Sequence, residues 1–423
     1  MKSRGFFSDE EVTAPTRMHK QAEFGCGICG LNKQCLSPKM KPSGAGRKGI
    51  LIVAEAPGRT EDEKGTQLVG EAGRLLRRKL EEYDIDLDRD CWKTNAVCCR
   101  PPKNRAPKSV EIASCRPNVW KTIEEYRPKL ILLCGGPAVE SFVGDRWNHN
   151  RLEGIGRWRG WTIPDRKARA WVCPIFHPSY VKRSQDAKER TLCVEKVFDQ
   201  DLERAVKKLS VPFPCGDLIR EEEMVKIITD ERELRNRLTR LIPHYEDHPE
   251  DLLTIDLETT GLKPYREGHE IVSCAISPRI DEAIAFPWPQ GVAKGALHRL
   301  FVHPGIKKVA ANAPFEDRWL HHFKYAIDDW YWDTLLAAHV LDNRPHITGL
   351  KFQAYVRYGV VGYSDDADKW LESGDSEKSK YGSNGFNRVK EFFNKEPQKL
   401  LLYNGMDALL TGRLASDQIG EMR

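Results

Sequence analysis

The chain has 423 residues, more than one ordinary hydrophobic core holds, and the usual domain size of about 100 to 200 residues predicts at least two domains. Hydrophobic residues make up 40% and charged residues 30%, which is typical of folded globular proteins, and no apolar run approaches the roughly 20 residues that cross a membrane. Residues 1–25 read as a polar tail without the apolar core of a signal peptide. We therefore expect a cytoplasmic protein with reduced thiols and no membrane partner.

Charge is divided unevenly along the chain. Residues 1–210 contain 40 Lys and Arg against 28 Asp and Glu, whereas the remaining residues contain 27 against 34. A basic half favours contacts with phosphates, and an acidic half suits carboxylates that collect divalent cations. Ordinary surface variation is the alternative explanation, so charge favours a nucleic-acid partner without identifying one.

The first half alternates predicted strands with predicted helices. Short apolar runs that end at turns predict buried strands, and the periodic segments between them predict helices. Such alternation is typical of a parallel, doubly wound α/β sheet. We expect strands at residues 49–54, 92–97, 130–134 and 171–175, and helices at residues 70–83, 109–126, 137–143 and 187–209.

A second domain follows a proline-rich linker. The run Val-Pro-Phe-Pro-Cys-Gly at residues 211–216 continues neither a helix nor a central strand, so we place the linker at 211–221, between domains at 26–210 and 222–423. Residues 363–387, rich in Asp, Ser, Lys and Gly, read as a mobile loop. Strands are expected at 224–228, 252–256, 271–276, 283–286 and 308–311, and helices at 231–242, 315–323, 334–341 and 398–418.

Three polar residues of the first domain stand at predicted strand ends. Glu55 follows the first strand, Asn95 belongs to the end of the second, and His177 follows the last. The carboxyl ends of strands are where α/β sheets place binding sites. Each residue also has a structural interpretation, since Asn95 could cap a turn, His177 could be a core histidine and Glu55 could bind a helix N-terminus.

The cysteines form a second pattern in the same domain. Ten of the twelve precede residue 210, and metal binding is the alternative to disulfides for such a set in a reducing compartment. Cys26 and Cys29 have the spacing that lets two thiolates reach one metal, and Cys99 and Cys115 would complete a site of four. Zinc and an iron-sulfur cluster both accept four thiolates, and the neighbouring alternatives are Cys35 and Cys98.

Residues 24–209 resemble the family 4 uracil-DNA glycosylases. The matching motifs occur in the family's order: Glu55-Ala-Pro-Gly58, Thr94-Asn95, Cys99-Arg-Pro-Pro, Cys115 and His177-Pro-Ser-Tyr180. The resemblance implies a 4Fe-4S cluster on Cys26, Cys29, Cys99 and Cys115, and removal of a uracil that is flipped out of the DNA. It assigns Asn95 to the Watson–Crick edge of uracil, His177 to the uracil oxygen that gains charge, Glu55 to water or the cationic sugar, and Ser179 and Tyr180 to the DNA.

One position of the uracil pocket departs from this family. Where the family has an aromatic residue that stacks on uracil, the run Gly65-Thr-Gln-Leu-Val-Gly70 has Leu68, and Ala54 replaces a preferred glycine nearby. Loss of a base–aromatic stack costs about 1–3 kcal/mol. Leu68 therefore bears directly on whether the first domain excises uracil or only binds DNA.

Carboxylates and a tyrosine at regular spacings mark the second domain. Asp256 and Glu258 point to the same side of a predicted strand, because side chains alternate with period two. Asn312-Ala-Pro-Phe-Glu316 and Tyr403-Asn-Gly-Met-Asp407 each place two residues on one helical face. Four carboxylates around two Mg²⁺ or Mn²⁺ ions are suited to phosphodiester hydrolysis.

Residues 222–420 resemble the DEDDy 3′–5′ exonucleases, in particular the proofreading domain of family A DNA polymerases. Asp333-Thr-Leu-Leu also matches that family. The resemblance implies a ribonuclease H-like mixed sheet, with Asp256, Glu258, Glu316 and Asp407 at the metals and Tyr403 orienting the attacking water. The family has aspartate where this chain has Glu316, and the adjacent Asp317 would need a local helix distortion to replace it.

The sequence therefore predicts a two-domain α/β protein of DNA replication or repair, of a kind found in phages, which would act in the host cytoplasm beside a separate DNA polymerase. The leading hypothesis is a bifunctional enzyme with uracil excision and metal-dependent 3′–5′ hydrolysis. The alternative is an exonuclease whose glycosylase-like domain only binds or tethers DNA. A replisome scaffold with two decayed sites is the third hypothesis, which the retained carboxylates disfavour.

Overall fold

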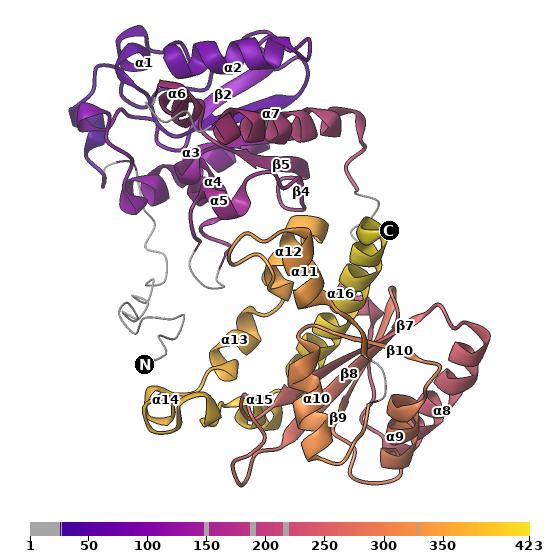
Figure 1. The fold of residues 1–423 in the computed structure, drawn as a ribbon. Helices are drawn as coiled ribbons and strands as arrows, with labels where there is room; N and C mark the ends of the chain where they lie inside the picture. The colour runs from indigo at the N-terminus through magenta and orange to yellow at the C-terminus, as the bar shows by residue number, and fades with distance from the viewer. Residues whose placement is uncertain (1–25, 27, 148–151, 187–191, 215–219, 328–329) are drawn as a thin grey trace, which may run out of the picture.

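Two β-sheets, one in each half of the chain, organise the computed structural model (Figure 1). It describes residue 26 and residues 28–147, 152–186, 192–214, 220–327 and 330–423, so the predicted tail lies outside the described residues. None of the helices in this described part is both long and apolar enough to cross a membrane.

The first sheet has the predicted parallel, doubly wound arrangement. Its strand order is β2-β1-β3-β5-β4, and four strands run parallel while β4 pairs antiparallel with β5 at one edge. The four predicted strands are present, and β4 was not predicted because it is only three residues long. The bounds are Ile50–Ala54 for β1, Cys91–Asn95 for β2, Leu130–Cys134 for β3, Ile163–Asp165 for β4 and Ala170–Ile175 for β5.

Helices cover both faces of this sheet, because successive apolar side chains of each strand point to opposite faces and both sets must be buried. Ile50 and Ile52 of β1 pack with α2 and α7, whereas Leu51 and Val53 face α3 and α4. α6 lies just beyond β5 and was not predicted, and residues 187–191 of the expected last helix lie outside the described residues. The helices are α1 (Arg59–Lys64), α2 (Glu71–Glu81), α3 (Ser109–Tyr126), α4 (Gly136–Val143), α5 (Ile155–Trp158), α6 (Pro178–Asp186) and α7 (Leu192–Lys207).

The second sheet is mixed, as predicted, with strand order β11-β10-β7-β8-β9-β6. β7, β8 and β9 form an antiparallel meander, and β10, β11 and β6 add parallel pairings on the two sides. The bounds are Val225–Ile227 for β6, Leu252–Thr259 for β7, Ile271–Arg279 for β8, Glu282–Pro287 for β9, Lys307–Ala310 for β10 and Trp330–Asp333 for β11.

The expectation of a mobile loop at 363–387 is wrong, because this segment contains α13 and α14. Its few apolar residues are enough to dock it: Trp370 stacks on Phe392 with ring centroids 5.5 Å apart, and Ala367 is buried in the same cluster. Tertiary packing thus overrides a polar composition. The helices of this domain are α8 (Glu231–Asp247), α9 (Lys294–Val302), α10 (Ala313–His322), α11 (Thr334–Leu341), α12 (Leu350–Tyr358), α13 (Asp365–Leu371), α14 (Asp375–Tyr381), α15 (Val389–Lys395) and α16 (Pro397–Met422).

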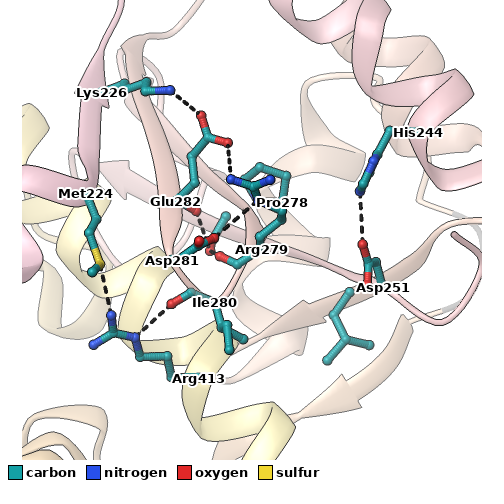
Figure 2. Close-up of polar contacts among 12 residues, drawn as sticks. Met224, Lys226, His244, Asp251, Pro278, Arg279, Ile280, Asp281, Glu282 and Arg413 are labelled. Atoms are coloured by element: carbon teal, nitrogen blue, oxygen red, sulfur yellow. Dashed lines mark hydrogen bonds and ion pairs between the residues drawn. The ribbon is translucent and has the colours of Figure 1, made fainter.

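The long helix α16 lies across the meander and is fixed at its C-terminal half by polar contacts (Figure 2). Arg413 Nε donates to Ile280 O at 2.8 Å, and Arg413 Nη2 donates to Met224 Sδ at 2.9 Å. Beside them, Lys226 Nζ donates to Glu282 Oε1 at 2.8 Å. The two contacts of Arg413 join α16 to the β8–β9 turn and to the segment before β6, and the Lys226–Glu282 contact joins β6 to β9.

Candidate active sites

Three carboxylates of the second domain meet at one point. Asp256 and Glu258 project from β7 and Asp407 from α16, and each has a ligand oxygen within 4.8 Å of the others. Glu258 and Asp407 are buried, at 7% and 8% exposure. The period of the strand and the placement of α16 across it account for this convergence.

The electrostatics of this group favour a bound cation. Burial raises the pKa of Asp256, and the neighbouring Asp407 raises it further. Burial also raises the pKa of Glu258, with Asp256 adding to the rise. Carboxylates that repel one another in a buried place are stabilised by a divalent ion, and oxygen donors are the ligands that Mg²⁺ and Mn²⁺ prefer. The donor set therefore fits such a metal.

Glu316 and Asp317 point in different directions. Glu316 is 3% exposed, and its Oε2 has no hydrogen-bond partner among the described residues. Burial raises the pKa of Glu316, and the charge of Asp256 raises it further. Asp317 is exposed and accepts a hydrogen bond from Trp330 Nε1 at 3.1 Å. Glu316 thus faces the carboxylates, whereas Asp317 faces away.

Asp333 has a structural role at the start of two helices. Its carboxylate caps α11 by accepting from Leu335 N at 2.9 Å, and it accepts from Ala313 N of α10 at 2.9 Å. Asp333 therefore holds the first turn of α10, one turn before Glu316.

Tyr403 is buried beside Asp407 and hydrogen-bonds its carboxylate. Three further residues touch this group and were missed in the sequence. Asn404 Nδ2 donates to Asp256 Oδ2 at 2.6 Å, and Tyr363 Oη donates to Asp407 Oδ1 at 2.6 Å. The third is Lys351, whose Nζ stands 5.4 Å from the centroid of the Tyr403 ring. Only Asn404, a polar residue beside Tyr403 in its motif, gave any sequence signal.

In the first domain, Asn95 lies at the carboxyl end of the sheet with an unsatisfied donor. β1 and β2 pair in register, with Ala54 opposite Asn95, so Glu55 follows directly beside it. Asn95 is 3% exposed, and its Nδ2 has no hydrogen-bond partner among the described residues. Burial raises the pKa of Glu55, and the Arg183 charge lowers it. Gly135, at the end of β3, has φ +93°, and a Cβ there would collide with the Glu55 carboxylate.

The hydrogen bonds of His177 define its tautomer. Ser179 N donates to His177 Nδ1 at 3.2 Å, and Ser179 Oγ lies 2.7 Å from the same nitrogen. An imidazole nitrogen that accepts carries no proton, so the proton of the neutral ring is on Nε2. Burial lowers the pKa of His177 to about 4, with Arg183 lowering it further. His177 is therefore a neutral donor through Nε2 at physiological pH.

Leu68 and Tyr180, the other two residues predicted for the uracil pocket and the DNA contact, differ in exposure. Leu68 has φ +54° and is 6% exposed, packed into the core beside Ala54. Its loop is held by Glu61 Oε1, which accepts from Gly70 N at 2.7 Å. Tyr180 is 43% exposed, with its ring 5.1 Å from that of Phe176. Tyr180 is thus available for contacts at the surface, whereas Leu68 is part of the buried core.

Six cysteines gather beside α3. Cys98, Cys99 and Cys115 are buried in one cluster, and Cys29 and Cys35 pack against it. The Cys26 thiol is close enough to Cys98 to perturb its pKa, after the larger effects of Cys115 and burial. Lys39 N donates to Cys99 Sγ at 3.2 Å, a contact that suits a thiolate. The donor set fits a group with four thiolate ligands, and it contains all four predicted ligands together with the two alternatives.

Comparison with known proteins matches the two halves of the chain to different families. The model of the uracil DNA glycosylase superfamily matches residues 42–200, and that of a 3′–5′ exonuclease matches residues 225–417. The type-4 uracil-DNA glycosylase of Saccharolobus solfataricus is 34% identical over 172 residues, which cover 40% of this chain and 74% of that protein. The type-4 enzyme of Thermotoga maritima is 36% identical over 148 residues, or 35% of this chain and 73% of that protein.

One relative spans both halves. The DNA polymerase of Bacillus phage SP01 is 26% identical over 373 residues, which cover 81% of this chain and 38% of the polymerase. The chain therefore spans less than two fifths of that protein. Through its first domain the chain belongs to the type-4 uracil-DNA glycosylase family, and its second domain is a 3′–5′ exonuclease domain similar to that of family A DNA polymerases.

Proposed function

We propose that this chain is a DNA replication or repair enzyme that removes nucleotides from 3′ ends with its second domain. The observation that carries the proposal is the convergence of Asp256, Glu258 and Asp407, with Glu316 buried beside them. These four carboxylates would hold two Mg²⁺ or Mn²⁺ ions, which activate water and stabilise the leaving 3′ oxygen when bound. Tyr403 orients the water, and Asn404 fixes the carboxylate of Asp256.

A 5′-labelled single strand tests this function. Full-length protein with Mg²⁺ or Mn²⁺ is expected to shorten it from the 3′ end, and the Asp256→Ala, Glu258→Ala double variant is expected to leave it intact. A circular dichroism spectrum like that of the wild type would show that the variant folds. Persistent shortening by the double variant would exclude the assignment.

We further propose that the first domain excises uracil. The unpaired Nδ2 of Asn95 supports this, because a side-chain amide can donate to O4 of uracil and accept from N3–H. His177 Nε2–H is a neutral donor suited to the uracil oxygen that gains charge as the glycosidic bond breaks with its electron pair. Glu55 would orient water or stabilise the cationic sugar, and Ser179 and Tyr180 would contact the DNA.

For the cysteines we propose a 4Fe-4S cluster on Cys26, Cys29, Cys99 and Cys115. Such a group would tie the segment before Leu31 to the loop after β2 and to α3. Visible absorption and iron content of purified protein distinguish this cluster from zinc, and single Cys→Ser variants distinguish these ligands from Cys35 and Cys98.

An assay on DNA with one uracil separates the bifunctional enzyme from its alternative. An abasic site formed by protein shown to hold its cluster would establish excision. Protein that holds its cluster, binds this DNA and forms no abasic site would identify a domain that only binds or tethers DNA. A DNA polymerase is the partner we propose for the exonuclease, and polymerase activity on primers with mismatched ends would rise in the presence of this protein.

A further inference from the structure

One face of α12, which belongs to the exonuclease half, is buried in the core of the glycosylase-like domain. Phe352 and Tyr355 are 2% and 0% exposed and share a cluster with Trp147 and Trp158. The Phe352 ring centroid lies 5.2 Å from that of Trp158 and 6.0 Å from that of Trp147. One face of α12 is therefore packed into the first domain in the same way as the first domain's own helices.

Contacts within α12 and on either side of it complete this attachment. Tyr355 Oη donates to Asp165 Oδ2 at 2.8 Å, in the edge strand β4. Before the helix, Arg344 Nη1 donates to Arg159 O at 2.6 Å and to Gly156 O at 3.1 Å. After the helix, Gly359 has φ +68°, and a Cβ there would collide with Pro164 O. The first domain thus fixes residues 344–359 from end to end.

The same helix also places a cation beside the nuclease carboxylates. Lys351 Nζ is held by an ion pair with Asp368 of α13 and stands 5.4 Å from the Tyr403 ring centroid. Tyr403 hydrogen-bonds the Asp407 carboxylate, so the Lys351 ammonium lies over the ring that contacts this carboxylate. Lys351 is next to Phe352 in the chain, so the anchor in one domain and the cation in the other share consecutive residues.

The segment leaving α12 makes a second connection to the site. Tyr363 follows the helix by five residues, donates to Asp407 Oδ1 at 2.6 Å and stacks on Tyr403 with ring centroids 6.2 Å apart. Tyr363, which orients Asp407, therefore lies only four residues after the anchored Gly359. Movement of α12 would shift the cation and this hydrogen bond together.

We propose that α12 is the element through which the glycosylase-like domain positions the exonuclease site, with Lys351 and Tyr363 as positioning residues for Tyr403 and Asp407. The inference rests on the exonuclease activity proposed above. It gives the first domain a role in the nuclease reaction that does not depend on uracil excision.

Kinetics of Lys351 variants in the full chain test the positioning role. Lys351→Met is expected to lower kcat on a single strand at least tenfold with KM for DNA unchanged, and Lys351→Arg is expected to recover part of kcat. Lys378→Met is the matched control, because Lys378 pairs with Glu372 at 3.0 Å on the surface and is expected to keep wild-type kinetics. An unchanged kcat, or a rise in KM alone, would overturn the role by showing that Lys351 is dispensable or binds DNA.

A second pair of variants tests the attachment itself. Phe352→Ala is expected to lower kcat at least fivefold, measured below its melting temperature. Phe301→Ala removes an equally buried ring from a different cluster of the exonuclease domain and is expected to leave kcat near the wild-type value. If Phe352→Ala does not fold, Arg344→Gln, which removes the bonds to Arg159 and Gly156, is expected to lower kcat in the same way. Wild-type kcat in a folded variant of either residue would refute the coupling.

The two levels of failure are distinguishable. Wild-type protein without Mg²⁺- or Mn²⁺-dependent shortening would remove the proposed function itself. Wild-type activity that is lost in the Asp256→Ala, Glu258→Ala variant but is indifferent to Lys351 and Phe352 would keep the function and remove only the coupling.

Discussion

Glu316 is expected to be the fourth functional carboxylate, although its family has aspartate there and Asp317 is adjacent. We predict that Glu316→Gln loses most nuclease activity, because it removes a buried carboxylate with an unpaired oxygen beside Asp256. A charge-assisted contact contributes about 3 kcal/mol, which corresponds to roughly 150-fold in kcat. Asp317→Asn is expected to keep kcat within about twofold, since its amide oxygen still accepts from Trp330 Nε1.

The assay is single-turnover hydrolysis of a 3′-labelled strand over a range of Mn²⁺ concentrations. Glu316→Gln is expected to need more Mn²⁺ for half-maximal rate, whereas Asp317→Asn follows the wild type. Glu316→Asp retracts the carboxylate by one methylene and is expected to lose about tenfold, since α10 is set for the longer side chain. A large loss in Asp317→Asn with little change in Glu316→Gln would show that α10 rotates when metal binds.

Four further results are expected. Asn404→Ala removes the donor to Asp256 and should lower kcat by about 10- to 150-fold, from about 1.5–3 kcal/mol for a hydrogen bond to a charged group; an unchanged kcat would contradict the contact. Leu68→Phe should raise uracil excision by about 5- to 150-fold if the missing stack limits capture of the base, and weaker excision would show that the buried backbone at Leu68 rejects a ring. Burial raises the pKa of Glu55 and lowers that of His177 to about 4. The rate of excision in a single turnover should therefore rise with pH as Glu55 ionises and then stay level. A decline of this rate with an apparent pKa near 6.5 would mean that protonated His177 is the donor. Chelation of divalent ions should stop strand shortening and leave uracil excision intact. An equal loss of the two activities would show that both depend on the same metal.

Most of the fold followed from the sequence, because its strands are short apolar runs with clear ends. The four parallel strands of the first domain and the mixed sheet of the second are present as predicted. The prediction that failed was the loop at 363–387. This polar segment forms helices that are held by contacts of Trp370 and Ala367 with residues distant in the sequence. Local composition carries no information about such contacts.

The site was predicted to a similar degree and for a related reason. Periodicity, which depends only on local geometry, paired Asp256 with Glu258 and Tyr403 with Asp407, and the resemblance to the exonucleases joined the two pairs in one site; the structure brings the three carboxylates together. Lys351 and Tyr363 were missed because α12 was not predicted, and its apolar residues found their partners in the other domain rather than in the exonuclease core. Residues positioned by contacts between domains leave no periodic signal of their own.

Close packing of α16 on the sheet explains how carboxylates from a helix and a strand come together in one group. Gly405 and Gly412 lie seven residues apart on the same face of α16. A Cβ at Gly412 would stand 2.9 Å from Thr254 Oγ1 of β7, and one at Gly405 would collide with Val225 of β6. Without side chains at these two points the helix backbone approaches the strands closely enough for the short side chain of Asp407 to reach Asp256 and Glu258. The glycines therefore set the distance between the two halves of the carboxylate group, while Lys351 and Tyr363, carried by α12 and the turn after it, set the orientation of what the helix brings there.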